Sequence, residues 1–544
     1  MILTTIVNDI VSGPEEQLIP AHLSYGQYMY DQLKKGGDKI ALISAETAES
    51  ITYRELLQYS VRAAIALQKL GLKKGDLVSI SCENRFEFVP AAFGVIFNGG
   101  LLSTWNITYS TGELIHLLHI TKPKFIFVSP ITAYNMVESC KEVPYDVRLI
   151  LFGDDEVVPS LMYNDLVKEA VNVDEYTLVD VNGRDDAVAV MCSSGTTGLP
   201  KGVMLTHVNF LTLTQHLRYY YEMSKLRGKH EVENALSLIP WFHAYGFITT
   251  MATIAMRIKL VFLIQFEPKQ FLETIQNYKI NETTIVPPLA VFLAKHPLVT
   301  KYDLSSLNEV WCGAAPLSRD IQRAITERTG LNYIKQGYGL TEVTMACCVD
   351  LTGGQKIGSC GTPAPGMKIK VIDIENGQRL GVGKEGELWI KSSLTMKGYM
   401  GDKAASDALF DSEGYVRTGD IGYYDKDGFF YIVDRLKELI KYKGFQVAPA
   451  EIEALLLQHE GVAECGVVGK PDEYAGELPL AFIVRQPGSN VSEQELVKYI
   501  ASKVSSAKQL RGGVLFVDEI PKNQSGKILR RELKKMLPTP KSKL

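Results

Sequence analysis

Cysteine is scarce in this sequence, and the spacing of the few cysteines does not suggest a metal site. The 544 residues hold eight cysteines, with no CxxC pair and no cysteine–histidine cluster at metal-binding spacing. The one close pair is Cys347 and Cys348, and adjacent cysteines on one continuous helix or strand point in different directions. We therefore expect free thiols in a reducing compartment.

Strong charge and long apolar runs are equally scarce. The net charge is −4 and no polybasic run is present, which argues against nucleic acid as a partner. The most apolar stretch, residues 247–266, is interrupted by Arg257 and Lys259, so we interpret it as a core helix followed by a strand and expect no transmembrane segment. The N-terminal stretch carries acidic side chains and no basic region, so we expect no secretory signal.

The pattern of apolar residues predicts an α/β protein of several domains, because a chain of this length exceeds one compact core. Between residues 21 and 430, apolar runs alternate with amphipathic stretches, which predicts parallel sheets with crossover helices. Strands are expected at residues 77–82, 124–128, 235–239, 260–264 and 309–312, and helices at 53–70 and 87–97. From Gly358, short strands separated by turns at residues 375–377, 411–414 and 425–428 indicate a β-rich subdomain.

A domain boundary is expected near residues 434–439, where charge density rises after a strand at 429–433. The remainder has the pattern of a small α+β domain. Its expected helices are residues 449–458 and 493–504, and its expected strands are 465–468, 480–484 and 514–517. We predict an N-terminal domain over 1–433, a hinge over 434–439 and a C-terminal domain over 440–541.

Residues 192–202 form the most informative segment, because they combine glycines, hydroxyl side chains and Lys201 directly after the apolar run 187–191. Glycine lets the backbone offer its N–H groups to an anion at close range, the hydroxyls add donors, and lysine adds a mobile positive charge. The spacing does not match a Walker A loop. We interpret the segment as a phosphate-binding loop rather than as a solvated turn.

Three further segments carry side chains suited to nucleotide chemistry. His243 lies between aromatic residues after an expected strand, where the alternative is a histidine buried in the core. The small residues 313–316 end another expected strand and leave room for a flat ligand. In residues 336–342, glycines flank Tyr338, and Glu342 could ligate Mg²⁺, although a turn with an exposed glutamate is the alternative.

The last third of the chain adds one carboxylate and two lysines. Asp420 follows a Thr-Gly pair and could accept hydrogen bonds from ribose, although a β-turn aspartate is the commoner case. Lys441 and Lys527 stand on glycine-bearing loops, where either could be a plain surface lysine. Together these segments contain the kinds of side chain that the binding and reaction of ATP require.

In this order, the segments resemble the acyl-adenylate-forming enzymes, which include acyl-CoA synthetases, 4-coumarate–CoA ligases and beetle luciferases. The likeness runs from about Tyr25 to the C-terminus and is most specific at residues 193–202, 338–342, 415–420 and 438–451. Residues 242–247, 511–514 and 542–544 are most similar to the insect luciferase-like fatty acyl-CoA synthetases and to the beetle luciferases themselves.

This resemblance implies a large N-terminal domain of two αβ-layered subdomains plus a β-rich subdomain, with a small mobile C-terminal lid. It implies ATP, Mg²⁺ and CoA as cofactors, an active site in the cleft between the domains, and rotation of the lid between two half-reactions. The catalytic residues it implies are Lys527, Lys441, His243, Thr341 and Glu342, with Glu342 as the Mg²⁺ ligand. The ATP- and AMP-binding residues it implies are Ser193, Ser194, Gly195, Thr196, Thr197, Gly198, Lys201, Ala314, Ala315, Gly337, Tyr338, Gly339, Thr341, Asp420, Arg435 and Lys527.

For the acyl pocket the resemblance implies His243, Tyr245 and Met345. Beetle luciferases typically carry a serine at the position of Met345, and the longer, apolar methionine favours an aliphatic acid. We also take Met345 to lie one helical turn beyond Glu342, if the segment is helical there. The first hypothesis is therefore a long- or medium-chain fatty acyl-CoA synthetase. The alternatives are a luciferase, a 4-coumarate-type ligase, and a non-catalytic acyl-binding protein.

The last three residues, Ser542, Lys543 and Leu544, form a peroxisomal address. They follow a proline-bearing tail that is expected to be accessible. We therefore expect a peroxisomal import receptor as a partner and the peroxisome as the location.

Overall fold

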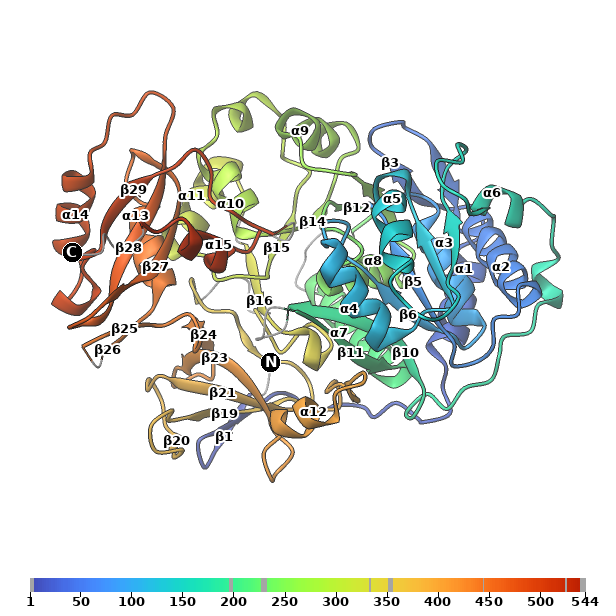
Figure 1. Cartoon of the computed structure of the whole chain (residues 1–544), viewed down its shortest axis with the longest axis horizontal. Coiled ribbons are helices and arrows are strands. Elements are labelled where there is room, and N and C mark those ends of the chain that lie inside the picture. Colours follow the sequence, from blue (N-terminus) through green and yellow to red (C-terminus); the bar gives the residue numbers. More distant parts are fainter. Residues whose placement is uncertain are drawn as a thin grey trace.

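The computed structural model describes residues 4–194, 199–226, 232–331, 334–350, 356–443, 445–523 and 526–538. Four sheets organise these residues. Figure 1 shows three of them in the large N-terminal part and the fourth in a smaller C-terminal domain. Residues 195–198 of the predicted phosphate loop and the C-terminal tripeptide lie outside the described residues.

The first sheet has the parallel core that the alternating pattern predicts. Its strand order is β22-β11-β10-β6-β5-β7-β8-β9. Its central strands are buried throughout, because α5 (Pro130–Cys140) and the wholly buried α3 (Phe88–Phe97) pack against the sheet. Helix α2 (Tyr53–Lys69) packs in turn against α3. The strands are β5 (Leu77–Ser81), β6 (Leu101–Thr104), β7 (Phe125–Val128), β8 (Arg148–Leu151), β9 (Leu161–Met162), β10 (Ala187–Ser194), β11 (Pro200–Thr206) and β22 (Gly398–Tyr399).

The second sheet lies beside the first and also has a parallel centre. Its order is β18-β17-β16-β15-β14-β12-β13-β3-β4. The strand β3 (Ile40–Ser44) precedes the first sheet in the chain, yet it pairs in parallel with β13, a pairing the sequence did not indicate. The remaining strands are β4 (Ser50–Thr52), β12 (Asn234–Ser237), β13 (Lys259–Phe262), β14 (Glu282–Ile285), β15 (Glu309–Cys312), β16 (Lys335–Tyr338), β17 (Cys348–Val349) and β18 (Thr362–Pro363).

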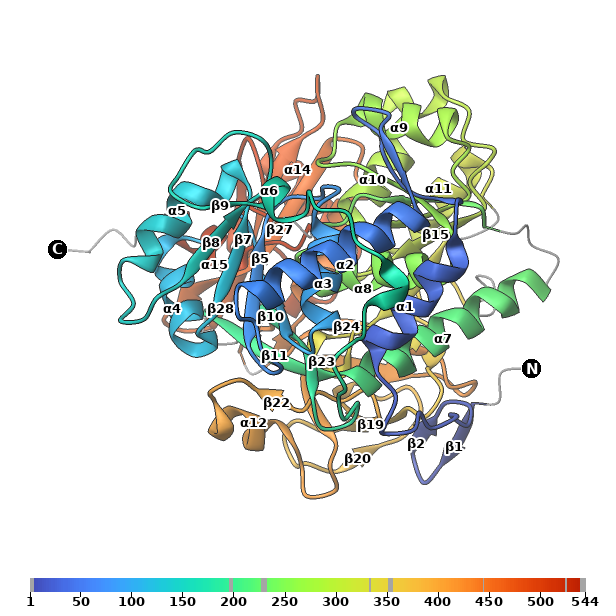
Figure 2. The ribbon, with the colours of Figure 1, turned by 90° about the vertical axis from the view of Figure 1, so that its right-hand side faces the viewer.

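The third sheet is the antiparallel β-rich subdomain. It is built on β19 (Lys368–Ile372), β20 (Arg379–Leu380), β21 (Gly386–Lys391), β23 (Val416–Tyr424) and β24 (Phe430–Arg435). The N-terminal hairpin of β1 (Thr5–Val7) and β2 (Ile10–Ser12) extends this sheet by pairing β2 with β19 (Figure 2). This long-range pairing was also not indicated by the sequence.

Two local expectations in this sheet were wrong. Strand β24 continues to Arg435 instead of ending at 433, because Asp434 and Arg435 still pair with β23. Asp420 is not the β-turn aspartate that the sequence left as the alternative, because residues 418–420 lie inside β23, which bulges there with Gly419 at a φ of 69°. Glycine accepts this left-handed conformation without strain.

The C-terminal domain is the small α+β unit that the sequence predicts. It contains the strands β25 (Ile440–Tyr442), β26 (Phe445–Val447), β27 (Val462–Asp472), β28 (Gly476–Arg485) and β29 (Gly513–Phe516) with the helices α13 (Pro449–Leu456), α14 (Glu493–Ala501) and α15 (Arg530–Lys535). Val467, Ile483 and Leu496 belong to its own apolar core. The predicted α/β class, with two αβ-layered subdomains, a β-rich subdomain and this small domain, is confirmed.

Two predicted absences can be compared with the structure. All eight cysteines are unbridged, as expected from their spacing. Among the described helices none has the length and apolar character needed to cross a membrane. The apolar stretch at 247–266 divides into helix α8 (Ala244–Ala255) and strand β13, as its two basic residues indicated.

Candidate active site

A cavity of about 2100 Å³ occupies the cleft between the large part and the C-terminal domain. It brings together residues that lie far apart in the sequence, from both sides of the cleft. The predicted site residues on its wall are Ser193, His243, Tyr245, Ala314, Ala315, Gly337, Tyr338, Gly339, Thr341, Glu342, Met345, Asp420, Arg435 and Lys527. This volume exceeds that of a typical small-molecule pocket and leaves room for a nucleotide and a second substrate.

His243 caps the N-terminus of helix α8. Its Nδ1 accepts a hydrogen bond of 3.2 Å from the backbone N–H of Tyr245, so the proton of the neutral ring is assigned to Nε2. Burial, together with the charge of Lys527, lowers the pKa of His243 to about 4. At neutral pH this histidine is an uncharged ring on the cavity wall.

Two residues at the ends of first-sheet strands, Asn84 and Thr104, bind the segment that carries His243. The Asn84 side chain, in the loop after β5, accepts from the Trp241 N–H at 2.8 Å and donates to the Leu263 carbonyl at 3.1 Å. Thr104 donates to the Phe242 carbonyl at 2.7 Å. Neither residue was predicted as part of the site. The one signal in the sequence was that both follow or end apolar strands, where ligand sites of α/β sheets gather.

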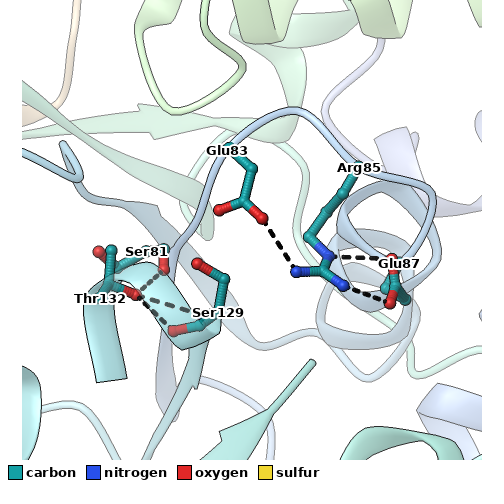
Figure 3. Close-up of polar contacts among 6 residues, drawn as sticks. All are labelled: Ser81, Glu83, Arg85, Glu87, Ser129 and Thr132. Atoms are coloured by element: carbon teal, nitrogen blue, oxygen red, sulfur yellow. Dashed lines mark hydrogen bonds and ion pairs between the residues drawn. The ribbon is translucent and has the colours of Figure 1, made fainter. Parts of the chain in front are cut away.

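The loop that contains Asn84 is itself fixed by polar contacts. Arg85 contacts Glu83 at 3.0 Å and Glu87 at 2.7 Å, and Thr132 donates to the Ser81 carbonyl at 2.6 Å (Figure 3). The buried Asn84 therefore projects from a rigid loop. This arrangement couples the position of the His243 segment to the first sheet.

At the other side of the cavity, three predicted nucleotide-binding residues form one cluster. The Tyr338 hydroxyl donates to Asp420 Oδ2 at 2.7 Å, and Arg435 Nε lies 3.0 Å from Asp420 Oδ1. Asp420 and Arg435 face each other across β23 and β24, and the Asp420 charge is the main reason that the pKa of Arg435 is raised. The carboxylate is thereby oriented in advance, as a ribose acceptor requires.

The segment from Gly339 to Met345 folds back sharply. A Cβ at Gly339 would lie 1.2 Å from the Met345 carbonyl oxygen, so a side chain at this position would displace the backbone. After a short 3₁₀ helix (Thr341–Val343), Thr344 and Met345 have φ values of 48° and 84°. The expectation of a continuous helical turn here was therefore wrong. A left-handed reversal, and not helical spacing, brings Met345 and Glu342 to the same cavity.

The candidate phosphate end gathers around Glu342. Its Oε1 accepts from the Tyr399 hydroxyl at 3.0 Å, and Lys201 Nζ lies 4.7 Å from the Tyr399 ring centroid. Ser193 lines the cavity, whereas Ser194 is the last residue of β10. Gly195, Thr196, Thr197 and Gly198 lie outside the described residues.

The donor set around Glu342 suits a magnesium ion carried by a nucleotide. Within the described ranges, no three His, Cys, Asp or Glu side chains are grouped as a metal site would need. Mg²⁺ commonly takes one carboxylate together with phosphate oxygens and water. Glu342 fits that role, and the ion would arrive with ATP.

The two predicted lid lysines occupy different places. Lys527 lies in the cavity wall, 3.9 Å from Glu438, and burial followed by the nearby Arg435 charge lowers its pKa. Lys441 lies in β25 with its side chain exposed, and it is not part of the cavity wall.

Direct contacts hold the C-terminal domain in this position. Lys295, at the end of helix α10 (Pro287–Lys295), donates to the Leu457 carbonyl at 2.5 Å. Gln458 donates to Asp320 at 2.6 Å. Both contacts involve the C-terminal end of α13, whose last carbonyls lack helical partners.

Known proteins resemble this chain over nearly its whole length. Residues 29–400 match the AMP-binding enzyme family, and residues 451–527 match the AMP-binding enzyme C-terminal domain. The chain is 40% identical to the luciferin 4-monooxygenase of Photuris pensylvanica, over 98% of this chain and 99% of that protein. It is 37% identical to the probable 4-coumarate–CoA ligase 3 of Dictyostelium discoideum, over 91% of this chain and 92% of that protein.

A solved structure shares the fold. The ATP-bound MatB of Rhodopseudomonas palustris superimposes with a TM-score of 0.83 and 26% sequence identity, covering 94% of this chain and 99% of that one. Family match, relatives and cavity thus agree with the resemblance drawn from the motifs. The chain belongs to the AMP-binding enzymes, the ATP-dependent adenylate-forming superfamily of acyl- and aryl-CoA ligases and luciferases.

Proposed function

We propose that this protein activates a fatty acid to acyl-AMP and then to acyl-CoA. One observation carries the choice of acid. Besides the cleft residues, Glu309 and Met256 line the cavity, together with other residues of the second sheet and of the helices α7 (His207–Leu226) and α8; we interpret this part as an acyl channel with Glu309 and Met256 at its far end. A strand that runs from Gly313, at the mouth of the channel, back to Glu309 spans about 13 Å. This length suits an extended acyl chain.

Much of the channel wall is apolar, which supports an aliphatic substrate. Leu217, Leu236, Ala252 and Met256 line it, and Met345 lies on the wall of the same cavity as Glu342. Each Å² of alkyl surface buried against such side chains stabilises the complex by about 25 cal/mol. Met345 offers no hydroxyl to a polar ring, so a heterocyclic acid gains less here than an alkyl chain.

In the first step the acid carboxylate attacks the α-phosphorus of ATP, and pyrophosphate leaves. Two anions must approach each other, so positive charge has to be in place beforehand. Lys527 supplies that charge from the cavity wall. The neutral His243 neither repels Lys527 nor forms an ion pair with the substrate carboxylate. Mg²⁺ bound at Glu342 would neutralise charge on the leaving pyrophosphate.

In the second step the CoA thiol loses its proton and attacks the acyl carbonyl, and AMP leaves. Asp420, Arg435 and Tyr338 would keep the AMP moiety in place through both steps by holding its ribose and adenine. Lys441 serves this step once the C-terminal domain has rotated. The rotation removes Lys527 from the active site and brings the face of the domain that carries Lys441 into its place.

The test is a substrate panel with the full chain, ATP, Mg²⁺ and CoA. Acid-dependent pyrophosphate release and acyl-CoA formation are measured for unbranched fatty acids, 4-coumarate and luciferin, in the native protein and in Met345→Ser. We expect fatty acids to give the highest kcat/KM in the native protein, and Met345→Ser to lower it several-fold while raising luciferin turnover. Preference for 4-coumarate, or an unchanged preference in the variant, would contradict the proposal.

A second candidate is a luciferase, favoured by the 40% identity to the Photuris luciferin 4-monooxygenase. Such an enzyme shares the adenylation residues and differs in the acid it oxidises with O₂. The same panel separates the two activities. Bright emission with luciferin from the native protein would support the luciferase, and acyl-CoA formation without light would support the ligase.

A further inference from the structure

The deep end of the channel carries charged residues that the two half-reactions do not use. Glu282, Glu309 and Lys335 stand on neighbouring parallel strands, β14, β15 and β16, and the strand register places Glu282 beside Glu309. Glu282, Glu309 and Trp311 line the cavity. Glu282, Glu309 and Lys335 are the first residues of their strands, whereas Tyr338 is the last residue of β16.

Lys335 forms its ion pair with Glu309, the neighbour of Glu282 in the sheet. Lys335 Nζ lies 2.6 Å from Glu309, and the two side chains are 4% and 6% exposed. The same ammonium lies 4.4 Å from the centroid of the Trp311 ring. The Glu309–Lys335 pair therefore balances its own charge inside the protein.

Glu282 has a different environment. Burial, with a further contribution from the Glu309 charge, raises the pKa of Glu282 to about 7, against the opposing influence of the Lys335 charge. The side chain is half-buried although it starts an interior strand. Because it lines the cavity, its remaining surface faces the channel.

Two threonine hydroxyls of helix α8, which lines the same cavity, are bonded within the helix itself. On helix α8, Thr249 donates to the Tyr245 carbonyl at 2.6 Å and Thr253 donates to the Thr249 carbonyl at 2.9 Å. These hydroxyls are therefore engaged within the helix, and Met256 on the same helix is apolar. A methyl end of a substrate at this depth would leave the Glu282 carboxyl without a partner, which is costly in an apolar site.

We propose that Glu282 forms a distal subsite of the acyl channel, which binds a hydroxyl group at the far end of an aliphatic acid. The substrate class is then ω-hydroxylated acids, which this enzyme prefers to simple alkanoic acids of equal length. A hydroxyl is favoured over an ammonium because a cation would lose its hydration to reach a position where Lys335 already supplies positive charge. The inference rests on the proposed ligase function and narrows its substrate.

The experiment compares acids of matched chain length that end in a methyl, a hydroxyl or an ammonium group. The measured quantity is kcat/KM for acid-dependent pyrophosphate release by the full chain. We expect the native protein to favour the hydroxyl over the methyl end by about tenfold or more. In Glu282→Leu this ratio should fall by about 10- to 100-fold.

Two further variants separate recognition from folding. Glu282→Gln keeps the size and an acceptor, so it should retain the hydroxyl preference to within a few-fold. Thr253→Val removes a channel-wall hydroxyl that is engaged in its helix, so the ratio should stay unchanged. If Glu282→Leu does not fold, a hydroxyl preference that is absent in the native protein still overturns the subsite.

The outcomes distinguish the subsite from the function on which it rests. Turnover of alkanoic acids with no hydroxyl preference, or with a preference that survives Glu282→Leu, overturns the subsite alone. Preference for the ammonium end overturns the assigned class of distal group. The absence of pyrophosphate release with every aliphatic acid overturns the proposed ligase function and the subsite together.

Discussion

At the scale of the residue, Glu282 makes the stability of the protein depend on pH. Its pKa is raised to about 7, whereas a glutamate in an unfolded chain titrates near 4.3. Between these values the native state binds more protons than the unfolded state, so the free energy of unfolding falls as pH rises. Below about pH 4 this contribution is fully present, and above about pH 8 it is lost.

The first prediction follows from this fall in the free energy of unfolding with rising pH. Glu282→Gln removes the ionisable group, so the variant should gain stability relative to the native protein as pH rises from 5 to 8, by up to roughly 3 kcal/mol for a shift of this size. Thermal midpoints of both proteins at the two pH values measure the effect. A difference between the proteins that is the same at pH 5 and pH 8 would contradict the assigned environment of Glu282.

The sequence revealed some site residues and could not reveal others. Tyr338 and Asp420 stand in short motifs with distinctive composition, so their place in the site was predictable from the resemblance. Asn84 and Glu282 act through partners on other strands of the fold, and nothing in their local sequence indicates those partners. The reversal at Met345 was missed because it depends on a close contact between Gly339 and a carbonyl six residues later.

At the scale of the element, the strands and helices were predictable where each buries its own apolar face. Strand β15 was predicted at its observed bounds, and α2, α3 and β7 to within a residue or two. The pairing of β3 with β13 and of β2 with β19 was not predictable. Local hydrophobic patterns specify which residues are buried, whereas the choice of a distant partner strand depends on the packing of the whole fold.

The second prediction concerns the two lid lysines, of which Lys441 lies in strand β25 and not on a loop as expected from the sequence. Lys527 lies in the cleft and Lys441 outside it, so Lys527→Ala should reduce acyl-AMP formation by about 10² to 10³-fold, the usual effect of losing one stabiliser of developing charge. Lys441→Ala should leave that step nearly unchanged and slow thioester formation. Acid-dependent pyrophosphate release and acyl-CoA formation from preformed acyl-AMP are measured separately. Equal damage to both steps by both variants would rule out two working positions of the domain.

At the scale of the whole molecule, the cleft works as a site only because two folding units meet across it. The large part supplies Asp420, Arg435 and His243, and the small domain supplies Lys527. The contacts between the two parts include the polar pairs of Lys295 with Leu457 and of Gln458 with Asp320, and a small apolar cluster of Ile421, Leu439 and Ala448. Interfaces of this kind permit relative motion of domains, which an enzyme with two successive half-reactions requires.

The last prediction concerns the location of the whole molecule. We propose that Ser542, Lys543 and Leu544 address the protein to peroxisomes, since a receptor reads this tripeptide at a C-terminus. The address is separate from the chemistry, because Lys527 and helix α15 precede it in the chain. A chain tagged at its N-terminus should therefore colocalise with a peroxisomal marker, and removal of residues 542–544 should leave it in the cytosol with unchanged kcat/KM. A shortened chain that still enters peroxisomes would show that the tripeptide is not the address, and a shortened chain with reduced activity would show that it contributes to the fold.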